Sequence, residues 1–109
     1  MTQKIFETCH VARYICVVII SFRHKGLKLY YDSGNATKLQ PKHVAKIRLI
    51  LTRLDACRSP EEMQVPGYDL HKLSGNLKNF WSVKVNGNYR IIFSFEGENV
   101  SDVDYLDYH

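Results

Sequence analysis

Residues 80–95 read FWSVKVNGNYRIIFSF, and this stretch decides the fold. Two runs rich in aromatic and β-branched side chains flank the turn sequence Asn86-Gly87-Asn88, which predicts a β-hairpin. Alternate residues of a strand point to opposite faces of the sheet. One face of the hairpin is therefore expected to be core, and it carries Trp81, Val83, Val85, Tyr89, Ile91, Phe93 and Phe95. The opposite face is expected to be polar and to carry Ser82, Lys84 and Arg90.

Further strands are predicted on both sides of this hairpin. Residues 68–73 and 100–108 alternate in the same way and are set off by Gly75-Asn76 and Gly97 turns. In the last strand, alternation places Val103, Tyr105, Asp107 and His109 on one side. Earlier in the chain, residues 15–22 form a β-branched run that predicts a strand buried on both faces.

Two helices are predicted in the first half of the chain. Residues 24–31 read as a short helix that ends at the stop signal Asp32-Ser33-Gly34. A longer helix follows Pro41, because apolar residues then recur at helical spacing at Val44, Ile47, Leu51 and Leu54. The predicted fold is therefore α+β, with two N-terminal helices packed on a mostly antiparallel sheet of four to five strands.

Size and composition narrow the functional classes. With 109 residues, 45% of them hydrophobic, the chain fits one domain. Its net charge of +4 modestly favours polyanionic partners such as RNA. Three cysteines with no CxxC pair predict neither a disulfide framework nor a zinc site, so we expect a reduced, cytoplasmic protein without cofactor or metal. The apolar run at residues 14–20 is too short to span a bilayer.

The chain ends on Asp107-Tyr108-His109, and this cluster suggests proton-transfer chemistry. Cleavage of RNA without a metal needs a base for the 2′-hydroxyl, a cation for the phosphate and an acid for the leaving oxygen. His71, Asp107 and His109 are candidate proton carriers, Arg90 is the candidate phosphate-binding cation, and Tyr108 can orient a base. The alternatives are an exposed polar tail, a strand-edge role for His71, and ordinary ion pairing of Arg90 with Glu96 or Asp104.

Basic residues near these positions are candidate RNA contacts. They are Arg23, Lys25, Lys28, Lys72, Lys78 and Lys84. A solvated helix or strand face is the alternative for each of them. Asp102 and Asp104 are paired carboxylates that suggest a divalent metal, but an edge strand that uses charge against aggregation explains them better.

Five blocks of sequence, in the same order, resemble the HigB toxins of the RelE superfamily. They are HKGLK at 24–28, LHKLSG at 70–75, FWSV at 80–83, NYRIIF at 88–93 and DYH at 107–109. The resemblance implies a small α+β domain that cleaves mRNA in the A site of the 70S ribosome. It also implies silencing by a HigA antitoxin with a helix-turn-helix domain. Carried over by position, the family's catalytic residues are His71, Arg90, Asp107, Tyr108 and His109.

The chain departs from the family pattern at two places. Members commonly have Pro-Leu-Lys-Gly after the histidine, whereas Lys72-Leu73-Ser74-Gly75 stands here, so Lys72 or Lys78 is expected to replace that basic contact. Residues 1–17 have no counterpart and are expected to be an N-terminal extension that runs into the first strand of a domain over 18–109.

Two other functions fit the same scaffold. One is a non-catalytic toxin like the ParE relatives, which inhibit gyrase through protein contacts and generally lack the acid-base cluster. The other is a plain RNA-binding or corepressor module, whose function would be retained after loss of both His71 and His109.

Overall fold

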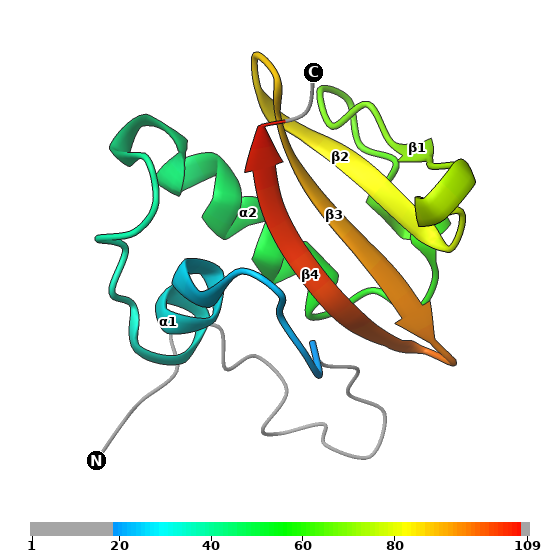
Figure 1. Cartoon of the computed structure of the whole chain (residues 1–109), viewed down its shortest axis with the longest axis horizontal. Coiled ribbons are helices and arrows are strands. Elements are labelled where there is room, and N and C mark those ends of the chain that lie inside the picture. Colours follow the sequence, from blue (N-terminus) through cyan, green and yellow to red (C-terminus); the bar gives the residue numbers. More distant parts are fainter. Residues whose placement is uncertain (1–18, 108–109) are drawn as a thin grey trace.

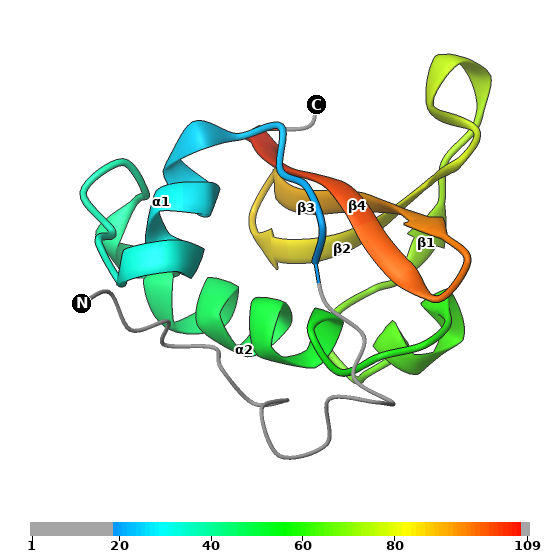
Figure 2. The same ribbon diagram turned by 90° about the horizontal axis from the view of Figure 1, so that it is seen from below.

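The computed structural model describes residues 19–107, and the statements below concern this part of the chain. The element order is α1 (Lys25–Ser33), η1 (Pro41–His43), α2 (Val44–Leu54), η2 (Pro60–Met63), β1 (His71–Lys72), η3 (Gly75–Leu77), β2 (Phe80–Asn86), β3 (Tyr89–Glu96) and β4 (Asn99–Asp107). The strands form one antiparallel sheet in the order β1-β2-β3-β4. In Figures 1 and 2, α2 lies against one face of the sheet and α1 lies beside its β4 edge. The α+β class predicted from sequence is confirmed.

The β2–β3 hairpin supplies one side of the core, as its alternation predicts. Val83 pairs with Ile91 and Trp81 with Phe93, so these side chains face α2 together. Val83, Ile91 and Phe93 are completely buried. Complete burial of a side chain of this size contributes about 1.5–3 kcal/mol, so these residues hold the sheet to the helix layer.

Both helices form in the segments where apolar residues recur at helical spacing in the sequence. In α2, Ile47, Ile50, Leu51 and Leu54 are completely buried along one face. In α1, the side chain of His24 accepts a hydrogen bond from the Leu27 N–H at the N-terminus. At the other end Gly34 adopts φ 82° and its N–H donates to the Tyr30 carbonyl, which confirms the predicted helix stop.

The outer face of the sheet is less polar than its sequence indicates. Phe80 and Ile92 lie on this face and are 7% and 2% exposed, and the Arg23 guanidinium lies 4.8 Å from the centre of the Phe80 ring. Ser94 Oγ and Ser101 Oγ are 2.8 Å apart and are also buried there. The prediction of a wholly polar outer face is therefore wrong, because apolar side chains lie on this face from Ile92, the residue that follows Arg90 on it, to Phe80.

The predicted strand over 15–22 is largely wrong where the structure describes it. Ile19 and Phe22 make only isolated parallel bridges to Val100 and Val103 of β4, and Ile20 is 47% exposed. Residues 15–18 lie outside the described part. A bulge in β4 explains the interruption, since Asp102 adopts φ 54° and the register with β3 shifts there. The Asp102 N–H then donates to Ser21 Oγ at 2.8 Å.

The predicted strand over 68–73 shortens to the two residues of β1. Gly67 at φ 91° and Asp69 at φ 53° both occupy the left-handed region, so the backbone cannot stay extended there. The Tyr68 carbonyl still accepts a hydrogen bond from the Lys84 N–H at 2.6 Å. This anchor fixes where the chain enters β1.

Asp55 ties the helical layer to the segment before α1. Its carboxylate is 2% exposed, and Oδ1 accepts hydrogen bonds from the Tyr31 hydroxyl at 2.6 Å and from the Ile19 N–H at 3.4 Å. Burial and the bond to Asp55 raise the pKa of Tyr31, so the hydroxyl keeps its proton and remains a donor. A buried carboxylate is stable only while such donors face it.

We predict that Tyr31→Phe destabilises the protein by about 1.5–3 kcal/mol, because it removes a donor from a buried carboxylate. The free energy of unfolding in urea measures the loss. Tyr68→Phe is the matched control, since the Tyr68 hydroxyl makes no hydrogen bond within residues 19–107, and it should change stability by less than about 0.5 kcal/mol. Equal losses in the two variants would contradict this role of Asp55.

We predict that stability falls as the pH drops below about 6.5, partly through His43. Burial lowers the pKa of this 1% exposed ring, whose Nδ1 is 2.7 Å from the Tyr105 hydroxyl. Below the ordinary histidine value the unfolded chain binds a proton that the folded chain does not, so acid favours unfolding. Urea unfolding from about pH 8 to about pH 5 should show a smaller decline for His43→Gln. If stability declined equally with falling pH in His43→Gln and in the wild type, His43 would be excluded as the source of the decline.

Candidate active site

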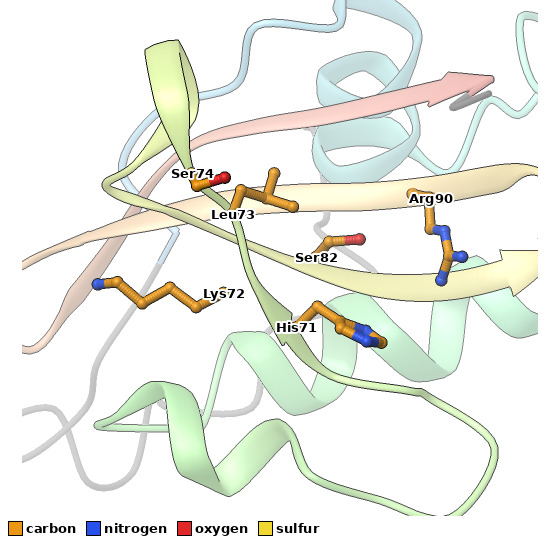
Figure 3. A pocket seen from close by; sticks show the side chains of 6 residues that line it. All are labelled: His71, Lys72, Leu73, Ser74, Ser82 and Arg90. Atoms are coloured by element: carbon orange, nitrogen blue, oxygen red, sulfur yellow. The ribbon is translucent and has the colours of Figure 1, made fainter.

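An open pocket of about 310 Å³ lies on the outer face of the sheet. Its lining residues are His71, Lys72, Leu73, Ser74, Ser82 and Arg90. They come from β1 with the loop after it, from β2 and from β3, and Figure 3 shows His71 and Arg90 extending toward one another across the opening. Two residues selected from sequence as catalytic therefore meet here.

Arg90 reaches the pocket because of the alternation in β3. Ile91 is buried in the core, so its neighbour must point to the outer face, where Arg90 pairs in register with Lys84 on one side and Leu106 on the other. The Arg90 side chain is only 21% exposed. Within residues 19–107, its Nε and Nη1 are buried and have no hydrogen-bond partner.

Unpartnered buried donors are uncommon in folded proteins because each costs about 1–3 kcal/mol. On a guanidinium they point to an anion, since the planar fork matches two oxygens of a carboxylate or phosphate. The pocket therefore combines a guanidinium whose buried donors lack partners with a histidine on the same face of the sheet.

His71 is held by a backbone contact that fixes its proton. Nδ1 lies 2.9 Å from the carbonyl oxygen of Asp69. A carbonyl only accepts, so Nδ1 carries the hydrogen and the lone pair of the neutral ring resides on Nε2. The ring is 60% exposed. His71 can therefore offer Nε2 to a substrate as a base.

Asp69 belongs to this site and was not selected from sequence. Its carboxylate oxygens lie 3.6 Å from His71 Nδ1 and 3.6 Å from Arg90 Nη1. Arg90 thus faces Asp69 rather than Glu96 or Asp104, the partners considered from sequence. The available signal is an aspartate two residues before the histidine and two residues after Gly67, and aspartate tolerates the left-handed region. That conformation costs about 1–3 kcal/mol outside glycine and persists where the surroundings impose it.

The end of β4 lies next to the pocket without lining it. Asp107 pairs with Tyr89, one residue beyond the Arg90–Leu106 pair, and by alternation shares the side of Tyr105. Tyr108 and His109 lie outside the described residues. The structure therefore brings together His71 and Arg90, whereas Asp107 lies at the end of β4 on the side of the buried Tyr105 and is not brought to the pocket face.

The candidate RNA contacts divide by distance from the pocket. Lys72 lines it, with Nζ 5.2 Å from the centre of the Trp81 ring, and exposed Lys84 is opposite Arg90. Exposed Lys78 follows η3. Arg23 stacks on Phe80 farther along the outer face. Lys25 and Lys28 lie on α1, away from the pocket lining, and Lys28 pairs with Asp32 at 2.7 Å.

A second pocket of about 370 Å³ lies at the end of α2 and lacks comparable chemistry. Its titratable residues include Cys57, whose pKa burial raises to about 12, so the thiol stays protonated. Among residues 19–107, no group of three or more histidine, cysteine, aspartate or glutamate side chains is arranged to hold a metal ion. In that same part of the chain, the helices are too short or too polar to cross a bilayer.

Comparison with known proteins places the chain in a family. Residues 20–109 match the family model of the HigB-like toxins, described as RelE-like toxins of type II toxin-antitoxin systems. Endoribonuclease HigB of Proteus vulgaris is 35% identical over 92 residues, which cover 84% of this chain and all of that protein. Toxin HigB-1 of Vibrio cholerae serotype O1 is 32% identical over 92 residues, which cover 83% of this chain and 96% of that protein. The resemblance drawn from the five sequence blocks is confirmed, and the chain belongs to the HigB-like toxins of type II toxin-antitoxin systems.

Proposed function

We propose that this toxin is an endoribonuclease that cleaves mRNA in the ribosomal A site. The observation that carries the proposal is the Arg90 guanidinium, which is 21% exposed and has two unpartnered donors, in the same pocket as the His71 imidazole. A phosphodiester supplies the two oxygen acceptors that this guanidinium lacks. The name of the Proteus vulgaris relative, Endoribonuclease HigB, supports the same activity.

The proposed reaction uses the chain's own proton carriers and no metal ion. A base removes the proton of the 2′-hydroxyl, the 2′-oxygen attacks phosphorus, and the bond to the 5′-oxygen breaks as an acid protonates that oxygen. The products are a 2′,3′-cyclic phosphate and a 5′-hydroxyl. Arg90 holds the charge that grows on the phosphate oxygens. His71 and Asp107 are the candidate bases, His109 is the candidate acid, and Tyr108 orients one of them or the RNA.

The basic residues are proposed to guide the RNA across the outer face. Lys84 lies opposite Arg90 on this face, while Lys78 and Arg23 extend the positive charge beyond the pocket. Lys72 lines the pocket, but its Nζ lies over the Trp81 ring and points away from His71 and Arg90 (Figure 3), so it contributes an outer contact. Lys25 and Lys28 on α1 contribute only outer contacts, since neither lines the pocket. The Arg23 guanidinium, fixed on the Phe80 ring, is the best oriented of these outer cations.

The partners follow from the proposed activity. We infer that the substrate is mRNA on the 70S ribosome, in the cytoplasm, and that the neutralising partner is a HigA-like antitoxin with a helix-turn-helix domain. The ParE-like alternative is inhibition of gyrase without catalysis. That function does not require His71 and Arg90 to line the same pocket.

We predict that His71→Ala and Arg90→Ala each slow mRNA cleavage by about 10²-fold or more, because each removes a group that acts in the transition state. Primer extension on programmed ribosomes locates the cut, and analysis of the new 3′ end should find a cyclic phosphate. Arg48→Ala is the matched control, since it removes an exposed arginine from α2 outside the pocket. It should cleave like the wild type.

Two outcomes would contradict the nuclease. One is intact mRNA with the wild-type protein, which together with inhibition of DNA supercoiling would favour the ParE-like alternative. The other is wild-type cleavage by both His71→Ala and Arg90→Ala. Arg90→Ala is expected to fold, because it removes buried donors that have no partner in the described structure.

A further inference from the structure

Asp69 places a carboxylate between the two pocket residues that carry the proposed chemistry. Oδ1 is 3.6 Å from His71 Nδ1, and Oδ2 is 3.6 Å from Arg90 Nη1. Both distances exceed those of hydrogen bonds, so the carboxylate acts on its neighbours through charge. It balances the guanidinium without forming a hydrogen bond to the buried donors Nε and Nη1, which have no partner in the described structure.

The backbone holds this carboxylate in place. Asp69 occupies the left-handed region at φ 53°, between two anchored residues. On one side, the Tyr68 ring is buried and the Tyr68 carbonyl accepts from the Lys84 N–H. Two residues later, His71 pairs with Ser82 of β2. As a result the carbonyl and the carboxylate of Asp69 both face the same imidazole nitrogen.

We propose that Asp69 is a positioning residue of the nuclease site, an internal counter-ion that holds Arg90 before RNA binds and supports His71 during proton transfer. This role rests on the proposed nuclease function. Its ligand is the scissile phosphodiester, which must share the guanidinium with the carboxylate when it enters the pocket.

The position between two charged partners gives Asp69 opposite effects on binding and on turnover. A phosphate approaching Arg90 is repelled by the carboxylate, so Asp69 weakens RNA binding. When His71 takes a proton from the 2′-hydroxyl, the same carboxylate balances the positive charge that the ring acquires. Removal of the charge should therefore tighten binding and slow the chemical step.

Asp69→Asn tests this role with little disturbance of the fold, because asparagine also tolerates the left-handed region. We expect kcat for mRNA cleavage to fall roughly tenfold, as is common when a partner that orients a catalytic side chain is lost. KM should fall below the wild-type value. A purely structural role would change neither constant per folded molecule.

Asp102→Asn is the matched control, since Asp102 has nearly the same φ, 54°, and its hydrogen bonds are with Ser21 and not with His71 or Arg90. It should keep wild-type kcat and KM. Asp69→Gly removes the carboxylate together with the backbone strain, so it should be at least as stable as the wild type and still lose kcat. Lost activity in Asp69→Asn that Asp69→Gly restores would show a backbone role and overturn the proposal.

A second readout needs no ribosome. Inorganic phosphate added to the free toxin should shift the Nε–H resonance of Arg90, and Asp69→Asn should saturate at a lower phosphate concentration than the wild type. Intact mRNA with the wild-type protein overturns the nuclease function. Wild-type cleavage with unchanged kcat and KM in Asp69→Asn, or equal phosphate affinity in the two proteins, overturns the role of Asp69 alone.

Discussion

The structure depends on one constraint, the burial of Ile91 and Phe93 of β3 against the helix layer. Once these side chains are committed to the core, the residues between and beside them must face the other way. Arg90 is one of them, and the register of the sheet aligns it with Lys84 of β2. The pairing of His71 with Ser82 then brings the imidazole to the same face. Core packing thus determines the position of the pocket.

The charge distribution in the pocket is suited to reversible binding of an anionic ligand. A guanidinium with every donor bound to protein would be a structural ion pair with little capacity for substrate. Arg90 instead faces a carboxylate at a distance where charge is balanced and hydrogen bonding is not satisfied. In the proposed reaction, a phosphodiester that enters would gain those hydrogen bonds, and the carboxylate would oppose its retention. Such a balance is compatible with repeated turnover.

Local patterns in the sequence were sufficient for the elements that form the core. The β2–β3 hairpin follows from two alternating runs around an Asn-Gly-Asn turn, and α2 follows from apolar residues at helical spacing. The predicted extents of two strands, over 15–22 and 68–73, were wrong for the same reason. Their limits are set by residues in the left-handed region, Asp102 in the facing strand and Asp69 within the segment. A hydrophobic pattern carries little information about such conformations.

The candidate site was partly predictable from sequence. Strand alternation placed Arg90 on the outer face, and His71 was a candidate proton carrier from its residue type and position, which the family resemblance supported. Asp69 was missed because its role depends on a contact with Arg90, a residue distant in sequence, which only the folded chain reveals. Alternation also placed Asp107 on the side of Tyr105, and the structure agrees. Tyr108 and His109 lie outside the described residues, so their roles stay predictions.

The brevity of β1 has a consequence for how the protein responds to heat. This strand pairs through two residues at an edge of the sheet, and the Leu73 N–H to Phe80 carbonyl bond at 2.9 Å supports the segment just after it. Edge segments with so few bonds open at a lower free-energy cost than the core does. The imidazole can therefore leave the pocket while the helices and the central hairpin are intact. For the proposed nuclease, warming would then reduce cleavage reversibly before the domain melts.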